Sequence, residues 1–490
     1  MLGLVRSMKN NLASISKLPS DVFPLIPGYL KDNDMDKTLI TMTHVCRRWR
    51  ELLITRPSLW VRLDCKNPDK TQVYTERSEL SPLDLSLCDR GSGAYLKDAF
   101  LLVVPHISRL KSLTVSGTVD PLQYLTPHLS CSIPLLSELT INLSCVPAPV
   151  LDAMLFNGNL SSLCSLNLSG VVTHLPWKNL SNLTTFNLFH VPQDTISITQ
   201  LLDFFENAHH LRNIELCDSI PKTSDVPPGR VVSLPHLKNF AILADPVHSI
   251  LLNHLSIPAG ASLTLTFEFT HDKSSVSDFL PKSLKNLGNI FPISSVNLSL
   301  VGYRKYLRFG GPNGELYVLG HCIGREERAV FTLDRQILQS LSRFDLSGTQ
   351  RLAIAGYEFP TGDAVGKSAP YQILSRMKDL HTLTLTRCNN LPFILALNPN
   401  ENSLRYILCP ELEELVLYVE GLDSFTIEEL MSMAKERASA GMKLSSITVV
   451  GLGGLIPEKV LGLGEYVTQV CRRVEEEPPR WDDVPGDENN

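Results

Sequence analysis

The side chains best suited to chemistry in this chain are its 13 histidines and 11 cysteines. The cysteines are scattered singly, and no group of them has the spacing of a zinc site. The chain also lacks a GxxxxGK[ST] phosphate loop, a GxSxG nucleophile turn and an HExxH helix. We therefore predict no catalytic residue, no metal site and no cofactor. Isolated thiols favour a cytoplasmic and/or nuclear protein.

One glycine-rich stretch, VVGLGGLIPEKV (449–460), follows an apolar segment, as the glycines of a dinucleotide-binding loop do. The third glycine of that fingerprint would fall at Ile456. We therefore interpret the stretch as a turn between structural units.

Binding chemistry is suggested by HVCRRWRELLITRPSLW (44–60), in which arginines accompany two tryptophans. Val45, Trp49 and Leu52 lie at positions i, i+4 and i+7, which predicts one apolar stripe on a helix with the arginines as a solvated flank. Nucleic acid is a poor partner, because 45 basic and 51 acidic residues give a net charge of −6. The stripe therefore indicates packing or docking against protein.

The composition favours a folded chain without membrane spans. Hydrophobic residues make up 43% and charged residues 20%, as in globular proteins. No run of 18 or more apolar residues is free of charge, and Arg6 and Lys9 interrupt the first apolar segment, so we expect neither a membrane partner nor an export signal.

A short apolar pattern of the form LxxLxL recurs along the chain. Its nine copies span residues 109–117, 135–144, 160–170, 180–189, 210–218, 236–245, 379–390, 411–421 and 443–451. The first residues of the closing apolar pairs are Leu113, Leu139, Leu166, Phe186, Ile214, Phe240, Leu383, Leu415 and Ile447. Most intervals suit leucine-rich-type repeats of about 20–29 residues. Each copy predicts a short strand, and one unit buries its apolar face only by stacking on the next.

Helical spacing of apolar residues lies between several of these strands, at 148–159, 197–210 and 425–441. The fold class is therefore α/β, a repeat solenoid with parallel strands. An irregular insertion at about 300–350 interrupts it, where 310–329 predicts a hairpin with Asn313-Gly314 as a two-residue turn.

A second pattern precedes the repeats. It consists of HVCRRWREL (44–52), RPSLW (56–60) and the apolar residues Leu18, Pro19, Val22, Ile26 and Leu30. These motifs resemble an F-box. The chain is similar to the F-box proteins abundant in mushroom-forming fungi, in which a stretch like ERS…PLDLSL (76–87) and leucine-rich-like repeats follow the box. The domain prediction is a flexible N-terminus (1–13), an F-box (14–62), a leucine-rich-repeat-like solenoid (63–470) and an acidic tail (471–490).

The resemblance implies a three-helix module that docks onto a Skp-family adaptor and, through it, onto a cullin-RING scaffold. The residues implied to form this docking site are Leu18, Pro19, Val22, Ile26, Leu30, Leu39, Val45, Cys46, Trp49, Leu52, Ser58, Leu59 and Trp60. Pro24 and Pro27 depart from the pattern, because proline inside a helix costs about 3 kcal/mol. We expect a shortened or distorted first helix.

Two functions remain open. The resemblance implies the non-catalytic, substrate-recognition subunit of an SCF-type ubiquitin ligase, whose repeats bind a target protein. The alternative is an interaction scaffold with a degenerate F-box and no role in ubiquitylation. In either case the outward side chains of the later strands are the candidates for binding the target: Thr384, Thr386, Arg387, Val416 and Tyr418.

Overall fold

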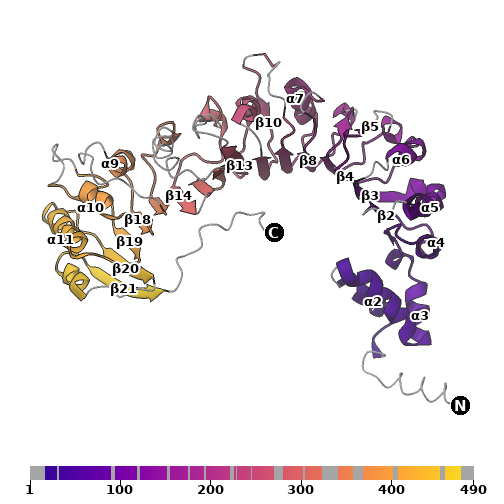
Figure 1. Ribbon diagram of the computed structural model, residues 1–490, viewed down its shortest axis with the longest axis horizontal. Coiled ribbons are helices and arrows are strands. Elements are labelled where there is room, and N and C mark those ends of the chain that lie inside the picture. The colour runs from indigo at the N-terminus through magenta and orange to yellow at the C-terminus, as the bar shows by residue number, and fades with distance from the viewer. Residues whose placement is uncertain are drawn as a thin grey trace. The chain divides into compact units, whose positions relative to one another are not determined.

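The computed structural model divides the chain into two compact units, Met1–Leu211 and Arg212–Asn490 (Figure 1). It describes residues 17–29, 32–89, 94–118, 122–151, 155–174, 177–192, 195–220, 226–227, 229–243, 246–269, 280–301, 304–322, 340–356, 368–400, 407–452 and 458–475. Both units are mixed α/β with mostly parallel strands. No helix in these ranges is both long and apolar enough to cross a membrane.

The first unit begins with short helices: η2 (Phe23–Tyr29), α2 (Asp32–Val45), α3 (Arg47–Ile54) and η3 (Pro57–Leu59). The first of these is a 3-10 helix with Pro27 inside it, which agrees with the predicted distortion. The predicted helical stripe of Val45, Trp49 and Leu52 is wrong. Cys46 is extended (φ −158°, ψ 167°) and separates α2 from α3, so Val45 belongs to a different helix.

Parallel strands follow. The remaining elements of this unit are β1 (Arg62–Leu63), α4 (Pro68–Arg77), β2 (Leu83–Asp89), α5 (Ala94–Val103), η4 (Val104–Arg109), β3 (Leu110–Gly117), α6 (Leu122–Leu129), β4 (Glu138–Leu143), β5 (Val150–Leu151), η5 (Leu155–Gly158), β6 (Ser165–Ser169), β7 (Val172–Thr173), η6 (Trp177–Asn179), β8 (Thr185–Phe189) and α7 (Ile198–Asn207). The main strands pair in chain order, β1-β2-β3-β4-β6-β8. Leu113, Leu139, Leu166 and Phe186 are partners in that ladder, and each is at most 1% exposed, so the predicted inward row is confirmed.

Of the two helices predicted between strands of this unit, one is confirmed and one is wrong. Ser197 and Gln200 form a capping box at the start of α7, which confirms the helix at 197–210. The helix predicted at 148–159 is wrong among its described residues. They form β5, which pairs with β7, and η5, in which Phe156 and Asn157 have positive φ. Fully buried Phe156 accounts for the apolar spacing without a helix.

The second unit contains β9 (Asn213–Cys217), β10 (Val232–Ser233), β11 (Asn239–Leu243), η7 (Pro246–His254), β12 (Leu255–Ser256), β13 (Ser262–Phe269), η9 (Leu284–Asn286), β14 (Ser295–Val301), β15 (Arg304–Gly310), β16 (Glu315–Cys322), β17 (Arg351–Ala355), α9 (Ala369–Leu374), β18 (Thr382–Thr386), α10 (Leu391–Leu397), β19 (Glu414–Val419), α11 (Ser424–Ser439), β20 (Ser446–Leu452), η11 (Glu458–Glu465) and β21 (Gln469–Glu475). α11 confirms the helix predicted at 425–441. β21 shows that 471–475, assigned to the acidic tail, continue the sheet. The rest of the tail lies outside the described residues.

The insertion reverses part of the strand order. β13 pairs with β16, β16 with β15, β15 with β14, and β14 with β17. β15 is antiparallel to both neighbours, so the parallel order of the strands is interrupted within the predicted insertion. The hairpin is confirmed, but its turn is centred on Pro312-Asn313, one residue early, because the Gly311 N–H donates to the Gly314 carbonyl (2.9 Å).

Candidate functional site

The N-terminal helices form a small core around aromatic side chains. The rings of Phe23 and Trp49 lie 4.6 Å apart, and the Trp60 indole N–H donates to the Leu53 carbonyl (2.9 Å). Phe23, Leu53 and Trp60 are at most 2% exposed, and Leu39 is fully buried. Leu39 and Trp60, both predicted at the docking site, therefore lie in the core.

Several apolar side chains remain uncovered on the same N-terminal segment. Val22, Leu25, Ile40 and Val45 are 41%, 56%, 40% and 52% exposed. Sequence reasoning missed Leu25 and Ile40, since only their exposure sets them apart from core residues. Isolated exposed apolar side chains are ordinary, but several on one small module are typical of a docking surface.

The other predicted docking residues are mostly accessible. Pro19 and Ser58 are exposed, and the half-buried ones are Leu18, Ile26, Cys46, Trp49, Leu52 and Leu59. Leu30 lies outside the described residues. Most of the predicted set is therefore available to a partner.

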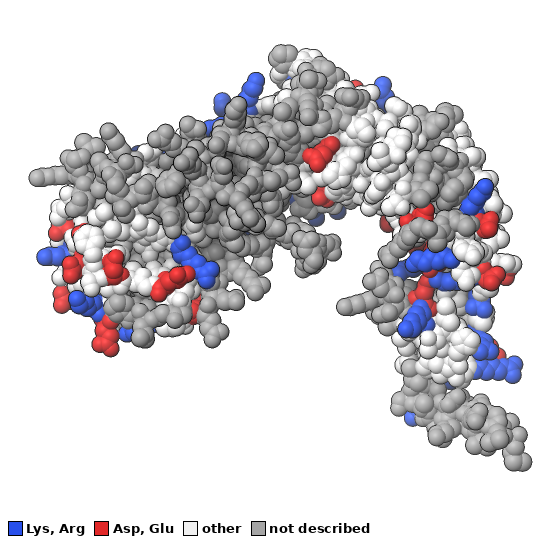
Figure 2. All heavy atoms as spheres, viewed as in Figure 1, with Lys and Arg blue, Asp and Glu red and all other residues white. Residues whose placement is uncertain are grey.

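The arginines of α3 lie on the solvated side, as predicted. Arg47 pairs with Glu51 at 2.8 Å, and the side chains are 93% and 62% exposed. Arg50 donates to the Thr43 carbonyl (2.9 Å), which ties α3 to the end of α2. In Figure 2 the charged side chains of this unit gather around the N-terminal helices and first strands.

A polar joint connects the N-terminal helices to α4. The Lys70 ammonium donates to Asp36 of α2 (2.6 Å) and to Asp64 (3.0 Å). Burial lowers the pKa of Lys70, but the two carboxylates outweigh burial and raise it overall. Trp60 contacts both the Tyr74 ring (5.0 Å) and the Arg77 guanidinium (4.4 Å). These contacts hold the helices in one orientation on α4.

The outward face of the first unit carries a ladder of small polar side chains. Thr140, Asn167 and Asn187 are register partners on β4, β6 and β8. The Asn187 amide donates to the Asn167 oxygen (2.6 Å), and the Asn167 amide to the Thr140 hydroxyl (3.2 Å). These side chains form hydrogen bonds with one another, so the ladder can stabilise the sheet as well as contact a ligand.

The predicted target-binding residues fall on neighbouring strands of the second unit. Thr384 is the register partner of Val416, and Thr386 that of Tyr418. Thr384, Val416 and Tyr418 are half-buried, and Arg387 faces Glu420 at 3.8 Å. Thr386 is 3% exposed, and its hydroxyl has no hydrogen-bond partner among the residues that the structure describes. The structure thus brings four accessible side chains together and buries the fifth.

Tyr418 is the aromatic group of this surface. Burial raises the pKa of its phenol, as does the charge of Glu475, while Arg473 opposes them. The phenol therefore stays protonated at neutral pH and can donate a hydrogen bond to a ligand.

Comparison with known protein families identifies the N-terminal region. Residues 15–66 match the family described as F-box-like. The matched range covers η2, α2, α3, η3 and β1, which include the uncovered apolar residues. F-box domains typically bind Skp-family adaptors, and proteins that carry them are generally adaptors rather than enzymes. A search of curated proteins found no match to the chain.

Proposed function

We propose that this chain is the substrate-recognition subunit of an SCF-type ubiquitin ligase. Its F-box-like domain binds a Skp-family adaptor and, through it, a cullin-RING scaffold. The single observation that carries the proposal is the uncovered apolar surface on the matched domain, including Val22, Leu25 and Val45. Burying this surface against an adaptor helix contributes about 25 cal/mol per Å² of apolar area.

The strands after the box form a leucine-rich-repeat-like solenoid in this proposal, as in the F-box proteins of mushroom-forming fungi. The support is the in-register, mostly parallel pairing of the recurring strands. The solenoid binds a target protein through the surface of Thr384, Arg387, Val416 and Tyr418, with Thr386 beneath. The protein performs no chemistry itself. It holds the target near the conjugating enzyme and so raises the effective concentration of target lysines.

A second function is an interaction scaffold without a role in ubiquitylation. The 3-10 conformation of η2 favours it, because Pro27 prevents a regular α-helix at the first docking segment. Adaptor binding distinguishes the two functions.

The test is co-elution of the full chain with a purified Skp-family adaptor in size-exclusion chromatography, with an ordinary F-box protein as positive control. We expect the wild-type chain to co-elute and Leu25→Glu/Val45→Glu to elute alone, since two charges would be buried unpaired in the interface. Leu80→Glu is the matched control, because Leu80 is 91% exposed and lies outside the matched domain. A wild-type chain that does not co-elute under conditions where the control does would establish the scaffold function instead.

A further inference from the structure

A pocket of about 570 Å³ lies in the second unit, and its lining includes none of the predicted target-binding residues. Lys282, Ser283, Leu284, Lys285, Phe291, Arg343 and Asp345 line it. Its volume is within the range of pockets that hold small ligands or single side chains. One wall is the segment that contains η9, and the other is the segment before β17.

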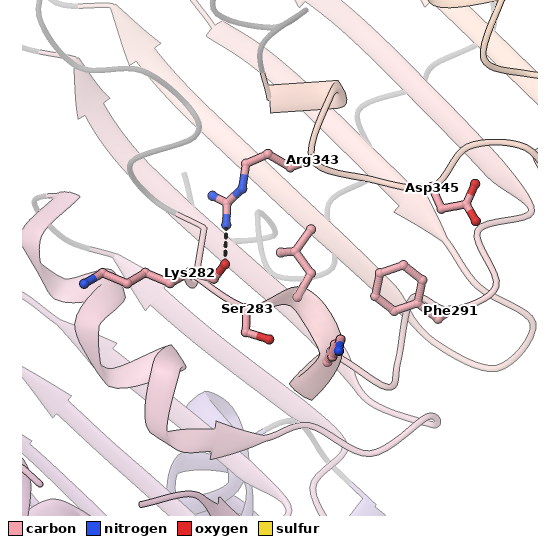
Figure 3. Close-up of a pocket in the computed structure, with 7 residues that line it drawn as sticks. Lys282, Ser283, Phe291, Arg343 and Asp345 are labelled. Carbon is pink, nitrogen blue, oxygen red and sulfur yellow. Dashed lines mark hydrogen bonds between the residues drawn. The ribbon is translucent and has the colours of Figure 1, made fainter. Parts of the chain in front are cut away.

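Both walls are fixed by hydrogen bonds. The Arg343 guanidinium donates to the carbonyls of Pro281 and Lys282, the latter at 3.2 Å (Figure 3), and the Lys282 N–H donates to Asn253 (2.6 Å). On the opposite wall, Arg376 donates to the Phe344 carbonyl (2.6 Å). The Phe344 ring stacks on Phe309 at 4.3 Å. A ligand therefore meets a pre-formed site and orders little backbone on binding.

The charges of the pocket are unbalanced. Three cations, Lys282, Lys285 and Arg343, face one carboxylate, Asp345. No ion pair involves Lys282 or Lys285 in the part of the chain that is described. Asp345 accepts hydrogen bonds from the Ser347 hydroxyl (2.7 Å) and N–H (3.1 Å), which lower its pKa, and Figure 3 places it at the end away from Lys282. The Lys282 end is therefore positive, and the other end offers the Phe291 ring.

We propose that this pocket binds an acidic peptide segment of a protein partner, with its acidic side chains at Lys282, Lys285 and Ser283 and an adjacent apolar side chain against Phe291 and Leu284. Charge complementarity selects this occupant, because the two ammonium groups form no ion pair with any described residue and border an apolar surface. The proposal rests on the proposed function only in taking the partner to be the target. Peptide binding requires neither adaptor nor ubiquitin, so its failure is distinguishable from failure of co-elution.

The experiment titrates the full chain with three labelled peptides and measures fluorescence anisotropy at low and at physiological salt. The first peptide has one leucine among four glutamates, the second has glutamine at every glutamate, and the third has glycine in place of leucine. We expect the first to bind, with affinity falling as salt rises, because exposed charge pairs are screened over about 8 Å at 0.15 M. The glutamine peptide should show no binding, and the glycine peptide should bind several-fold more weakly.

Charge reversal locates the site. We expect Lys282→Glu/Lys285→Glu to weaken binding of the glutamate peptide by about fivefold or more, since each exposed ion pair contributes about 0.2–1 kcal/mol. Lys435→Glu/Lys443→Glu makes the same change of charge at two exposed lysines outside the pocket, and it should leave affinity within about twofold. Equal losses of affinity in the two variants would show that the net charge of the chain, and not this pocket, attracts the peptide. That result would overturn the proposal. Equal binding of the glutamate and glutamine peptides would do the same.

Discussion

At the residue scale, Arg437 is a fully buried cation whose hydrogen bonds, among the described residues, go to backbone carbonyls. Its guanidinium donates to the carbonyls of Leu408 (2.9 Å) and Cys409 (2.8 Å), and burial lowers its pKa. Cys409 has a positive φ of 48°, so the chain turns sharply there. Arg437 therefore satisfies two carbonyls at a strained turn next to β19, the strand that carries Val416 and Tyr418.

Arg437→Lys tests this role. The lysine keeps the charge, but one ammonium group cannot reproduce the planar fork that reaches both carbonyls. We expect a loss of about 1–3 kcal/mol in the free energy of unfolding, measured by urea denaturation, because a buried acceptor is left unsatisfied. An unchanged midpoint would show that the two carbonyls find other partners.

Asparagine side chains of two tripeptides, Asn179-Leu180-Ser181 and Asn182-Leu183-Thr184, bond to the preceding strand-loop segment. The Asn179 amide donates to the Gly158 carbonyl (2.8 Å), and the Asn182 amide to the Ser161 carbonyl (2.7 Å). Each bond joins the segment before β8 to the segment before β6. The two asparagines therefore stabilise the stacking of these neighbouring segments.

At the scale of elements, the joint between α2 and α4 depends on Lys70. We expect Lys70→Met to lower the free energy of unfolding by about 1–2 kcal/mol, because Asp36 and Asp64 lose a shared, half-buried cation. Lys66→Met is the matched control, since Lys66 reaches Asp64 only at 4.0 Å and is 66% exposed. Equal losses of unfolding free energy in the two variants would show that Lys70 does not hold α2 and α4 together.

The same joint predicts a pH dependence. The folded-state pKa of Lys70 is raised, so its contribution is fully present below the unfolded pKa of about 10.4 and is lost as pH rises through the folded value. The stability difference between wild type and Lys70→Met should stay constant from about pH 6 to 9 and shrink only in more alkaline solution. Thermal unfolding of both proteins across this pH range measures the stability difference. A difference that changes near neutral pH would show that a titratable group other than Lys70 causes it.

The hairpin of β15 and β16 depends on Gly314. A Cβ there would lie 2.5 Å from the Ala261 carbonyl oxygen and 2.6 Å from that of Ala259. We expect Gly314→Ala to destabilise the second unit by about 1–3 kcal/mol, as overpacking does. Gly348→Ala is the control, because its added Cβ would have no described residue within 4 Å other than its chain neighbours. Differential scanning calorimetry compares the two, and equal unfolding temperatures would count against a close approach.

At the scale of the whole molecule, adaptor docking and target binding use different elements in the proposed function. We expect affinity purification of Leu25→Glu/Val45→Glu from cells to recover the target without the adaptor. The wild-type chain should recover both, with more target after proteasome inhibition. Loss of the target together with the adaptor would show that the two surfaces do not act separately.

Residue patterns alone predict the F-box-like region, which matches over 15–66, and the strands at all nine recurring segments. Both are local signals, since alternating apolar residues specify which side chains of a strand are buried. The registers of Leu383 with Leu415 and of Leu415 with Ile447 follow from that pattern.

The neighbours of each strand at the insertion are set by tertiary packing, because β16 and β14 exchange the places around β15 that chain order would give them. Period-two burial is the same for parallel and antiparallel neighbours, so the sequence pattern cannot distinguish them. Tertiary packing also sets which apolar residues are exposed, as Leu25 is, or buried, as Leu39 is, and it places Arg437 in the core. Burial depends on which elements pack together, and residue type specifies only what burial would cost or contribute.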